Sequence, residues 1–98
     1  MGSEFQQTWH LRLYVRGDSP ITPSVIHNVR AICDAYMPGD HQLEIIDIAK
    51  QPERAADEQI IALPTLVRLA PAPVRRLMGD LANHERVIVA LNLRHSKT

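Results

Sequence analysis

The chain has 98 residues, of which 45% are hydrophobic, so it can build one domain with a modest core and is too apolar for wholesale disorder. Eleven basic side chains balance eleven acidic ones, which argues against a dedicated binder of nucleic acid or of an anionic membrane surface. The single cysteine excludes an internal disulfide, and no apolar run reaches the length of a membrane span. Because no signal-peptide pattern opens the chain either, we expect a cytoplasmic protein.

The first five residues, Met-Gly-Ser-Glu-Phe, look like a scar from an expression vector. We therefore expect a single domain over residues 6–98, without repeats or linkers. Its charge is unevenly spread: residues 40–58 carry six acidic and two basic side chains, whereas residues 59–98 carry six basic and two acidic ones. Two interpretations stay open, namely solvated faces that partly neutralise each other and complementarity with a partner or a second copy.

The segment TWHLRLYVRG alternates between apolar and polar residues, which predicts a half-buried strand with Tyr14 on its solvent side. A helix is expected next, over TPSVIHNVRAICDAY, with Thr22 as its cap and Pro23 in its first turn. The helix ends before Pro38 and Gly39. Its apolar face holds Val25, Val29, Ile32, Cys33 and Tyr36, so Cys33 is interpreted as a small buried hydrophobe.

The second half begins with HQLEIIDIA, a nearly continuous apolar run that predicts a buried strand, with Asp47 at its exposed end or paired. A short helix over QPERAADEQIIA and two short strands within LPTLVRLAPAPVRRLM follow. Gly79 and Asp80 are expected to break the last strand and to cap a final helix over DLANHERVIVALNL. That helix is uncertain because Val87, Ile88 and Val89 are β-branched and favour a strand.

This order, βαβαββα, implies right-handed crossovers and a small mixed sheet covered by helices. With a Leu-Pro-Thr turn entering the third strand, it resembles the α/β thioredoxin fold. The resemblance implies a cis peptide bond before Pro64, in a tight reversal opposite the start of the first helix. Thioredoxin-like enzymes carry a pair of cysteines at that helix start, whereas RGDSPITPSV carries none. Dithiol exchange is therefore nearly excluded.

The resemblance narrows to one family. The segments LRLYVRGDSP, LEIIDIAKQPERAADEQIIALPTLVRLAPAPVRRLMGDL and ERVIVALNL are similar to the KaiB family of circadian-clock proteins, over about residues 11–93. The most specific block is ALPTLVRLAPAPVRRLMGDL, in which Leu63 stands where the family usually has threonine. A match of this length and order is far more specific than a single short motif.

Membership in that family implies a protein that is not an enzyme and that needs no cofactor. Its partners would be a hexameric KaiC-like ATPase and, in some systems, KaiA or a histidine kinase. The family is metamorphic: a thioredoxin-like βαβαββα monomer binds KaiC, and a βαββααβ form assembles as a homotetramer, so a dimer or tetramer is expected here. The ambivalent C-terminal segment suits such a switch, because it has to satisfy both folds.

The candidate partner-binding residues are Lys50, Arg68, Arg75 and Arg76. Arginine is enriched at interfaces, although one arginine of the Arg75–Arg76 pair could simply be solvated and the other paired with an acid. Lys50 and the helix that begins at Pro52 would flank the KaiC-facing surface in the thioredoxin-like form.

Two positions bear on the balance between the folds. Ala90 and Asn92 stand where cyanobacterial relatives commonly have glycine and aspartate. Alanine is the better helix former by about 1 kcal/mol, so this departure is expected to favour the helical, binding-competent form.

Two other hypotheses remain. The chain could be a thioredoxin-like sensor module, as in the KaiC-binding domain of a histidine kinase, or a thioredoxin-like enzyme that uses Cys33 alone. The five histidines show no metal-ligand spacing, and neither a phosphate-binding glycine loop nor a nucleophile elbow is present.

Overall fold

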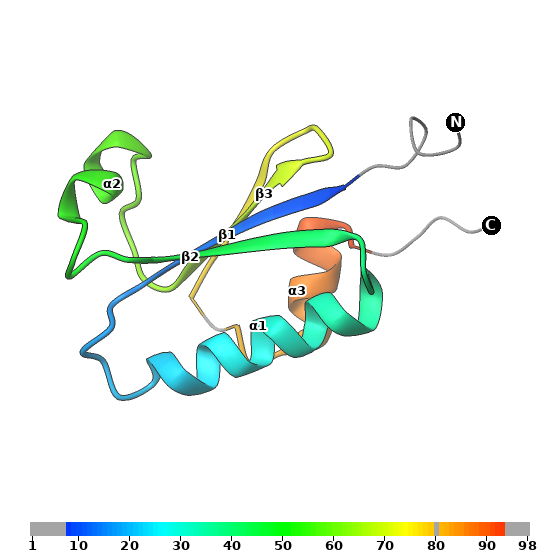
Figure 1. Ribbon diagram of the computed structural model, residues 1–98, viewed down its shortest axis with the longest axis horizontal. Coiled ribbons are helices and arrows are strands. Elements are labelled where there is room, and N and C mark those ends of the chain that lie inside the picture. The colour runs from blue at the N-terminus through cyan, green and yellow to red at the C-terminus, as the bar shows by residue number, and fades with distance from the viewer. Residues whose placement is uncertain (1–7, 80, 94–98) are drawn as a thin grey trace.

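The computed structural model describes residues 8–79 and 81–93 (Figure 1). Within these residues, four strands and three helices follow one another in the order βαβαββα, as the sequence predicts. In chain order they are β1 (Trp9–Val15), α1 (Thr22–Tyr36), β2 (His41–Asp47), α2 (Pro52–Asp57), β3 (Thr65–Ala70), β4 (Arg75–Met78) and α3 (His84–Leu91). Residues 1–5 and Asp80 lie outside the described residues, so the vector scar stays a prediction.

The strands form one mixed sheet in the order β2-β1-β3-β4. The pair β1–β2 is parallel, and the pairs β1–β3 and β3–β4 are antiparallel. Helices α1 and α3 lie on the same face of this sheet, below it in Figure 1, whereas α2 lies beyond one end. The main core fills the space between the sheet and these two helices, and its most buried side chains are Leu13, Val29, Val87, Leu91 and Leu93.

The opposite, outer face of the sheet holds a second, smaller apolar cluster of Tyr14, Ile46 and Val67. The prediction that Tyr14 faces solvent is wrong, because its side chain is only 1% exposed. Ile48, Ile60, Leu63 and Leu69 pack against the cluster. The first three come from the connections on either side of α2, and Leu69 comes from β3. Alternation along one strand cannot reveal such a cover, since the covering residues are distant in sequence.

The predicted caps of the first and last helices need correction, whereas α2 begins at Pro52 as predicted. Ile21 rather than Thr22 precedes the first turn of α1, and the Thr22 hydroxyl donates a hydrogen bond to the Arg16 carbonyl. Helix α3 begins at His84, later than predicted. Its cap is Asn83 rather than the predicted Asp80, because the Asn83 side chain accepts a hydrogen bond from the Arg86 amide. Asparagine is one of the favoured capping residues, so a competing cap nearer the apolar run displaced the predicted boundary.

The ambivalent segment is helical in this structure. Helix α3 buries Val87, Ile88 and Leu91, and Ala90 lies within its last turn. Asn92 ends the helix in the left-handed conformation, with φ of 53°, which asparagine tolerates better than most residues. Tertiary burial of one apolar face therefore outweighs the strand preference of the β-branched run.

Three proline peptide bonds are cis: Leu63–Pro64, Ala70–Pro71 and Ala72–Pro73. The first is the one that the sequence predicts. Gly79 ends β4 with φ of +95° and donates its amide hydrogen to the Pro64 carbonyl over 3.0 Å. Among the described residues, no helix is both long and apolar enough to cross a membrane.

Candidate functional site

Helix α2 contains no buried residue, unlike the other elements among the described residues. Two arginines of the sheet fasten its far end to the outer face of the sheet. Arg76 of β4 donates to the main-chain carbonyls of Glu58 and Gln59, over 2.8 Å and 3.3 Å. Arg12 of β1 donates to the Glu58 carboxylate over 3.2 Å. These polar contacts, together with the apolar packing of Ile48 and Ile60 on either side of the helix, position α2.

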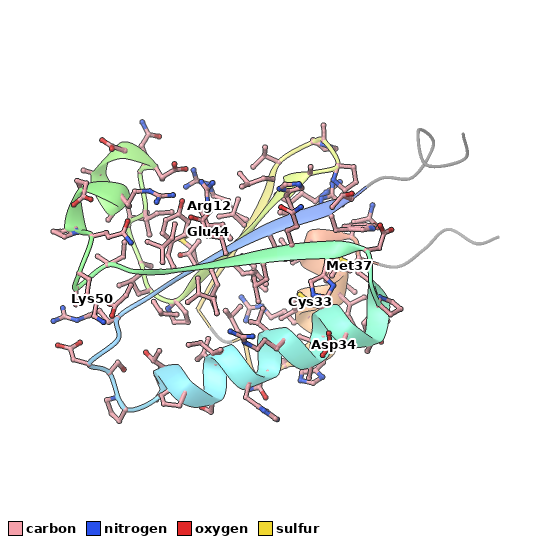
Figure 2. All side chains as sticks on the ribbon, in the orientation of Figure 1. Arg12, Cys33, Asp34, Met37, Glu44 and Lys50 are labelled. Carbon is pink, nitrogen blue, oxygen red and sulfur yellow. The ribbon has the colours of Figure 1, made fainter. Side chains whose placement is uncertain are left out.

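Arg12 is the centre of this outer-face network, and it lies beside Glu44 in Figure 2. The two residues are direct cross-strand neighbours, and the Arg12 Nε donates to the Glu44 carboxylate over 2.9 Å. The hydrogen bond from Arg12 to the Tyr14 hydroxyl, together with Glu44, raises the pKa of Arg12. Arg54 of α2 reaches the same carboxylate over 3.7 Å. Part of the acidic charge of residues 40–58 is therefore neutralised internally.

What remains exposed forms a contiguous region that we call the α2 surface: Lys50, helix α2 and the connection up to Ile61. Lys50 is exposed beside the start of α2, where the sequence predicts it (Figure 2). Ile61 is 84% exposed, more than any other large hydrophobic side chain among the described residues. Sequence reasoning missed Ile61; the signal was the Ile60–Ile61 pair, of which only Ile60 packs against the sheet.

The loops that flank this surface are tied together by Asp47. Its carboxylate accepts hydrogen bonds from the Gly17 amide over 2.8 Å and from the Ala49 amide over 3.0 Å. A Cβ atom on Gly17 would lie 2.0 Å from that carboxylate. The alternative in which Asp47 is paired at the end of its strand is therefore confirmed, with main-chain amides as partners.

The predicted arginines separate in space. Arg76 points to α2, whereas Arg75 lies at the start of β4, opposite Arg68 across the β3–β4 pair. Arg68, a predicted partner-binding residue, is buried in this fold: its side chain is 3% exposed and lies against α3. Partner contact through Arg68 is thus not available here, and contact through Lys50, Arg75 or Arg76 stays a prediction.

Pro64 lies opposite the start of α1, as the thioredoxin resemblance implies. It lines a hollow of about 120 Å³ together with Leu63, Ile21, Thr22 and Val25. None of the described residues that line this hollow is a cysteine or a methionine. No group of three or more metal-binding side chains occurs among residues 8–79 and 81–93.

Comparison with known proteins decides the family. The family model described as the KaiB domain matches residues 12–93. The chain belongs to the KaiB family. It is 39% identical over 88 residues to the circadian clock oscillator protein KaiB of Prochlorococcus marinus strain MIT 9312, covering 90% of this chain and 84% of that relative. The KaiB protein of Synechococcus strain RCC307 is 40% identical, at 90% and 80% coverage.

Solved structures agree with the fold of this KaiB-family chain. The N-terminal domain of Synechococcus elongatus SasA superposes with a TM-score of 0.72 and 22% identity, covering 96% of this chain and 92% of that domain. Mitochondrial thioredoxin 3 of Saccharomyces cerevisiae superposes with a TM-score of 0.68 and 16% identity, at 89% and 79% coverage. At these identities the likeness establishes a thioredoxin-like fold and nothing about activity.

The likeness to thioredoxins raises the question of thiol chemistry, which in this KaiB-family chain could use only Cys33. Its side chain is 1% exposed within the core, on α1 (Figure 2). Burial, with a contribution from Asp34, raises the pKa of Cys33 to about 11. The thiolate is the reactive form, so the thiol is both protonated and inaccessible near neutral pH.

We expect iodoacetamide to alkylate Cys33 at least tenfold more slowly in the folded protein at pH 8 than in the urea-unfolded chain. Unfolding returns the thiol pKa to about 8.5, which restores a substantial thiolate fraction. Mass spectrometry of timed, quenched samples measures both rates. Equal rates would revive the hypothesis of an enzyme that uses Cys33 alone.

Proposed function

We propose that this chain is a KaiB-type binding protein that docks on a hexameric KaiC-like ATPase and modulates its phosphorylation or ATPase cycle in circadian, timing or stress signalling. The observation that carries the proposal is the KaiB-domain match over residues 12–93. The names of the relatives support it, since both are circadian clock oscillator proteins. In this proposal the protein acts without catalysis of its own and without a cofactor, in the cytoplasm.

The α2 surface supplies the docking site in this proposal. It joins an exposed lysine, an exposed helix and a solvent-facing isoleucine. Arg12 and Arg76 of the sheet hold its far end, and Arg54 of α2 pairs with Glu44 of β2. Interfaces gain most of their affinity from a few apolar or aromatic contacts surrounded by polar ones. Lys50 would supply the polar contact, and Ile61 would supply the apolar one.

The proposed mechanism is a population shift between two folds. The thioredoxin-like βαβαββα monomer is the form competent to bind the ring, and a βαββααβ homotetramer is the competing form. A ring that binds only one form pulls the equilibrium toward it by its differential affinity. The helical last turn around Ala90 agrees with the expectation that this chain favours the binding form.

A second candidate function is a sensor module like the KaiC-binding domain of a histidine kinase, which would use the same surface without switching its fold. We retain this second candidate because the chain shares its fold with the N-terminal domain of SasA. Nuclear magnetic resonance of the isolated chain across a concentration series separates the two. A second set of resonances that grows with concentration supports the metamorphic protein, and a single unchanging set supports the module.

The direct test is native mass spectrometry of the chain mixed with the KaiC-like hexamer of the same organism in the presence of ATP. We expect complexes in which one ring carries several copies of the chain. If both proteins are folded and no complex forms at micromolar concentrations, the proposed function is wrong. Adding KaiA, where the organism encodes it, then tells whether the complex recruits a third component.

A further inference from the structure

The C-terminal segment, residues 84–93, has little helical strength of its own. Helix α3 is eight residues long, well below the ~12–15 residues at which an isolated helix becomes even marginal in water. Three consecutive β-branched residues, from Val87 to Val89, weaken it further. Contacts with the rest of the fold must therefore decide its conformation. The buried apolar face and the Asn83 cap supply some of these contacts, and the end of the helix needs others.

One buried side chain, Arg68 of β3, makes those contacts at the end of the helix. Its Nη1 donates to the Leu91 carbonyl over 2.9 Å and to the Asn92 carbonyl over 3.3 Å. Its Nη2 donates to the Pro73 carbonyl over 2.9 Å, in the turn between β3 and β4. A cation at a helix C-terminus satisfies free carbonyls and opposes the negative end of the helix dipole.

The surroundings of Arg68 contain no balancing carboxylate among its described partners. Burial, with a contribution from the neighbouring Arg75, lowers the pKa of Arg68. Its Nε is buried without a hydrogen-bond partner in the described part of the chain. The Trp9 ring, 5.6 Å away from the guanidinium carbon, is the remaining favourable contact. The carbonyls at the helix end therefore supply most of the hydrogen bonds of the buried guanidinium, and the guanidinium supplies the donor for those carbonyls.

We propose that Arg68 is a latch that keeps the C-terminal segment helical and docked on the sheet. If the last turn unwinds, Arg68 loses two of its three carbonyl partners while it stays buried, and the helix end loses its donors. Each loss reinforces the other, because an unpaired buried polar group is costly. The segment is thereby either docked as a unit or released as a unit, with the β3–β4 turn coupled to it through Pro73. This inference does not rest on the proposed partner.

The test is native-state hydrogen exchange of the full chain carrying Arg68→Met, read at amides of the helix end and of the sheet. The amides of Asn92 and Leu93 report the last turn, since they donate to Val89 and Ile88, and the amide of Leu13 in β1 reports the sheet. We expect protection at Leu93 to fall at least tenfold more than protection at Leu13. Equal losses at both positions, or no loss at Leu93, would overturn the latch.

Two further variants complete the design. Arg75→Met makes the same chemical change at the cross-strand neighbour, which touches none of these carbonyls, so protection at Leu93 is expected to stay the same or to rise. Arg68→Lys keeps the charge but loses the planar fork that spans two carbonyls, and it carries the test if Arg68→Met does not fold. If Arg68→Lys kept the same ratio of protection at Leu93 to protection at Leu13 as the parent chain, the proposal would be overturned.

Discussion

Replacing Ile61 with glutamate is expected to weaken binding to the KaiC-like ring about thirtyfold, because losing a central apolar contact typically costs ~2 kcal/mol or more. Ile61 is 84% exposed in the free chain, so the substitution buries no charge and leaves the fold intact. A carboxylate forced into an apolar contact would also lose its hydration without gaining a partner. Titration of the labelled chain against the ATP-loaded hexamer measures the dissociation constants.

Val89→Glu is the matched control for this experiment. Val89 is also a solvent-facing hydrophobe, 64% exposed, but it lies on α3, which Figure 1 shows far from α2. Because the chemical change is the same, any general effect of added negative charge appears in both variants. Equal weakening by Val89→Glu and Ile61→Glu, or no weakening by Ile61→Glu, would remove the α2 surface as the docking site while leaving ring binding itself intact.

Most of the architecture could be predicted because it follows from local periodicity. Alternation identified β1, and the 3.6-residue repeat of apolar side chains identified α1, whose interior residues Val29 and Ile32 are buried. The cis bond at Pro64 followed from the resemblance to thioredoxins. These features depend on neighbours in sequence or on a recognisable turn, so one sequence carries enough information to place them.

What could not be predicted depends on contacts between distant segments. Tyr14 is covered by residues that come from several later parts of the chain. Arg68 looks like a surface cation in sequence, yet it is buried because the end of α3 presents carbonyls to it. Ile60 and Ile61 are chemically identical, and only the path of the chain after α2 decides which of them packs. The periodicity of residues within one element carries no information about these tertiary contacts.

Replacing Gly17 with alanine is expected to lower the free energy of unfolding by about 2 kcal/mol, the scale of losing hydrogen bonds to a charged acceptor. A Cβ atom at this position would lie 2.0 Å from the Asp47 Oδ2 and 2.8 Å from its Cγ. The carboxylate would have to rotate away, which breaks its bonds to the Gly17 and Ala49 amides. Urea unfolding, followed by circular dichroism, measures the change.

A double-mutant cycle distinguishes this steric cause from an ordinary loss of glycine flexibility. Asp47→Ala alone removes both hydrogen bonds, and it also removes the atoms that would clash with a new Cβ. Gly17→Ala combined with Asp47→Ala should therefore be no less stable than Asp47→Ala by itself, which is strong non-additivity between two residues in contact. If the two losses simply add, the clash is not the cause.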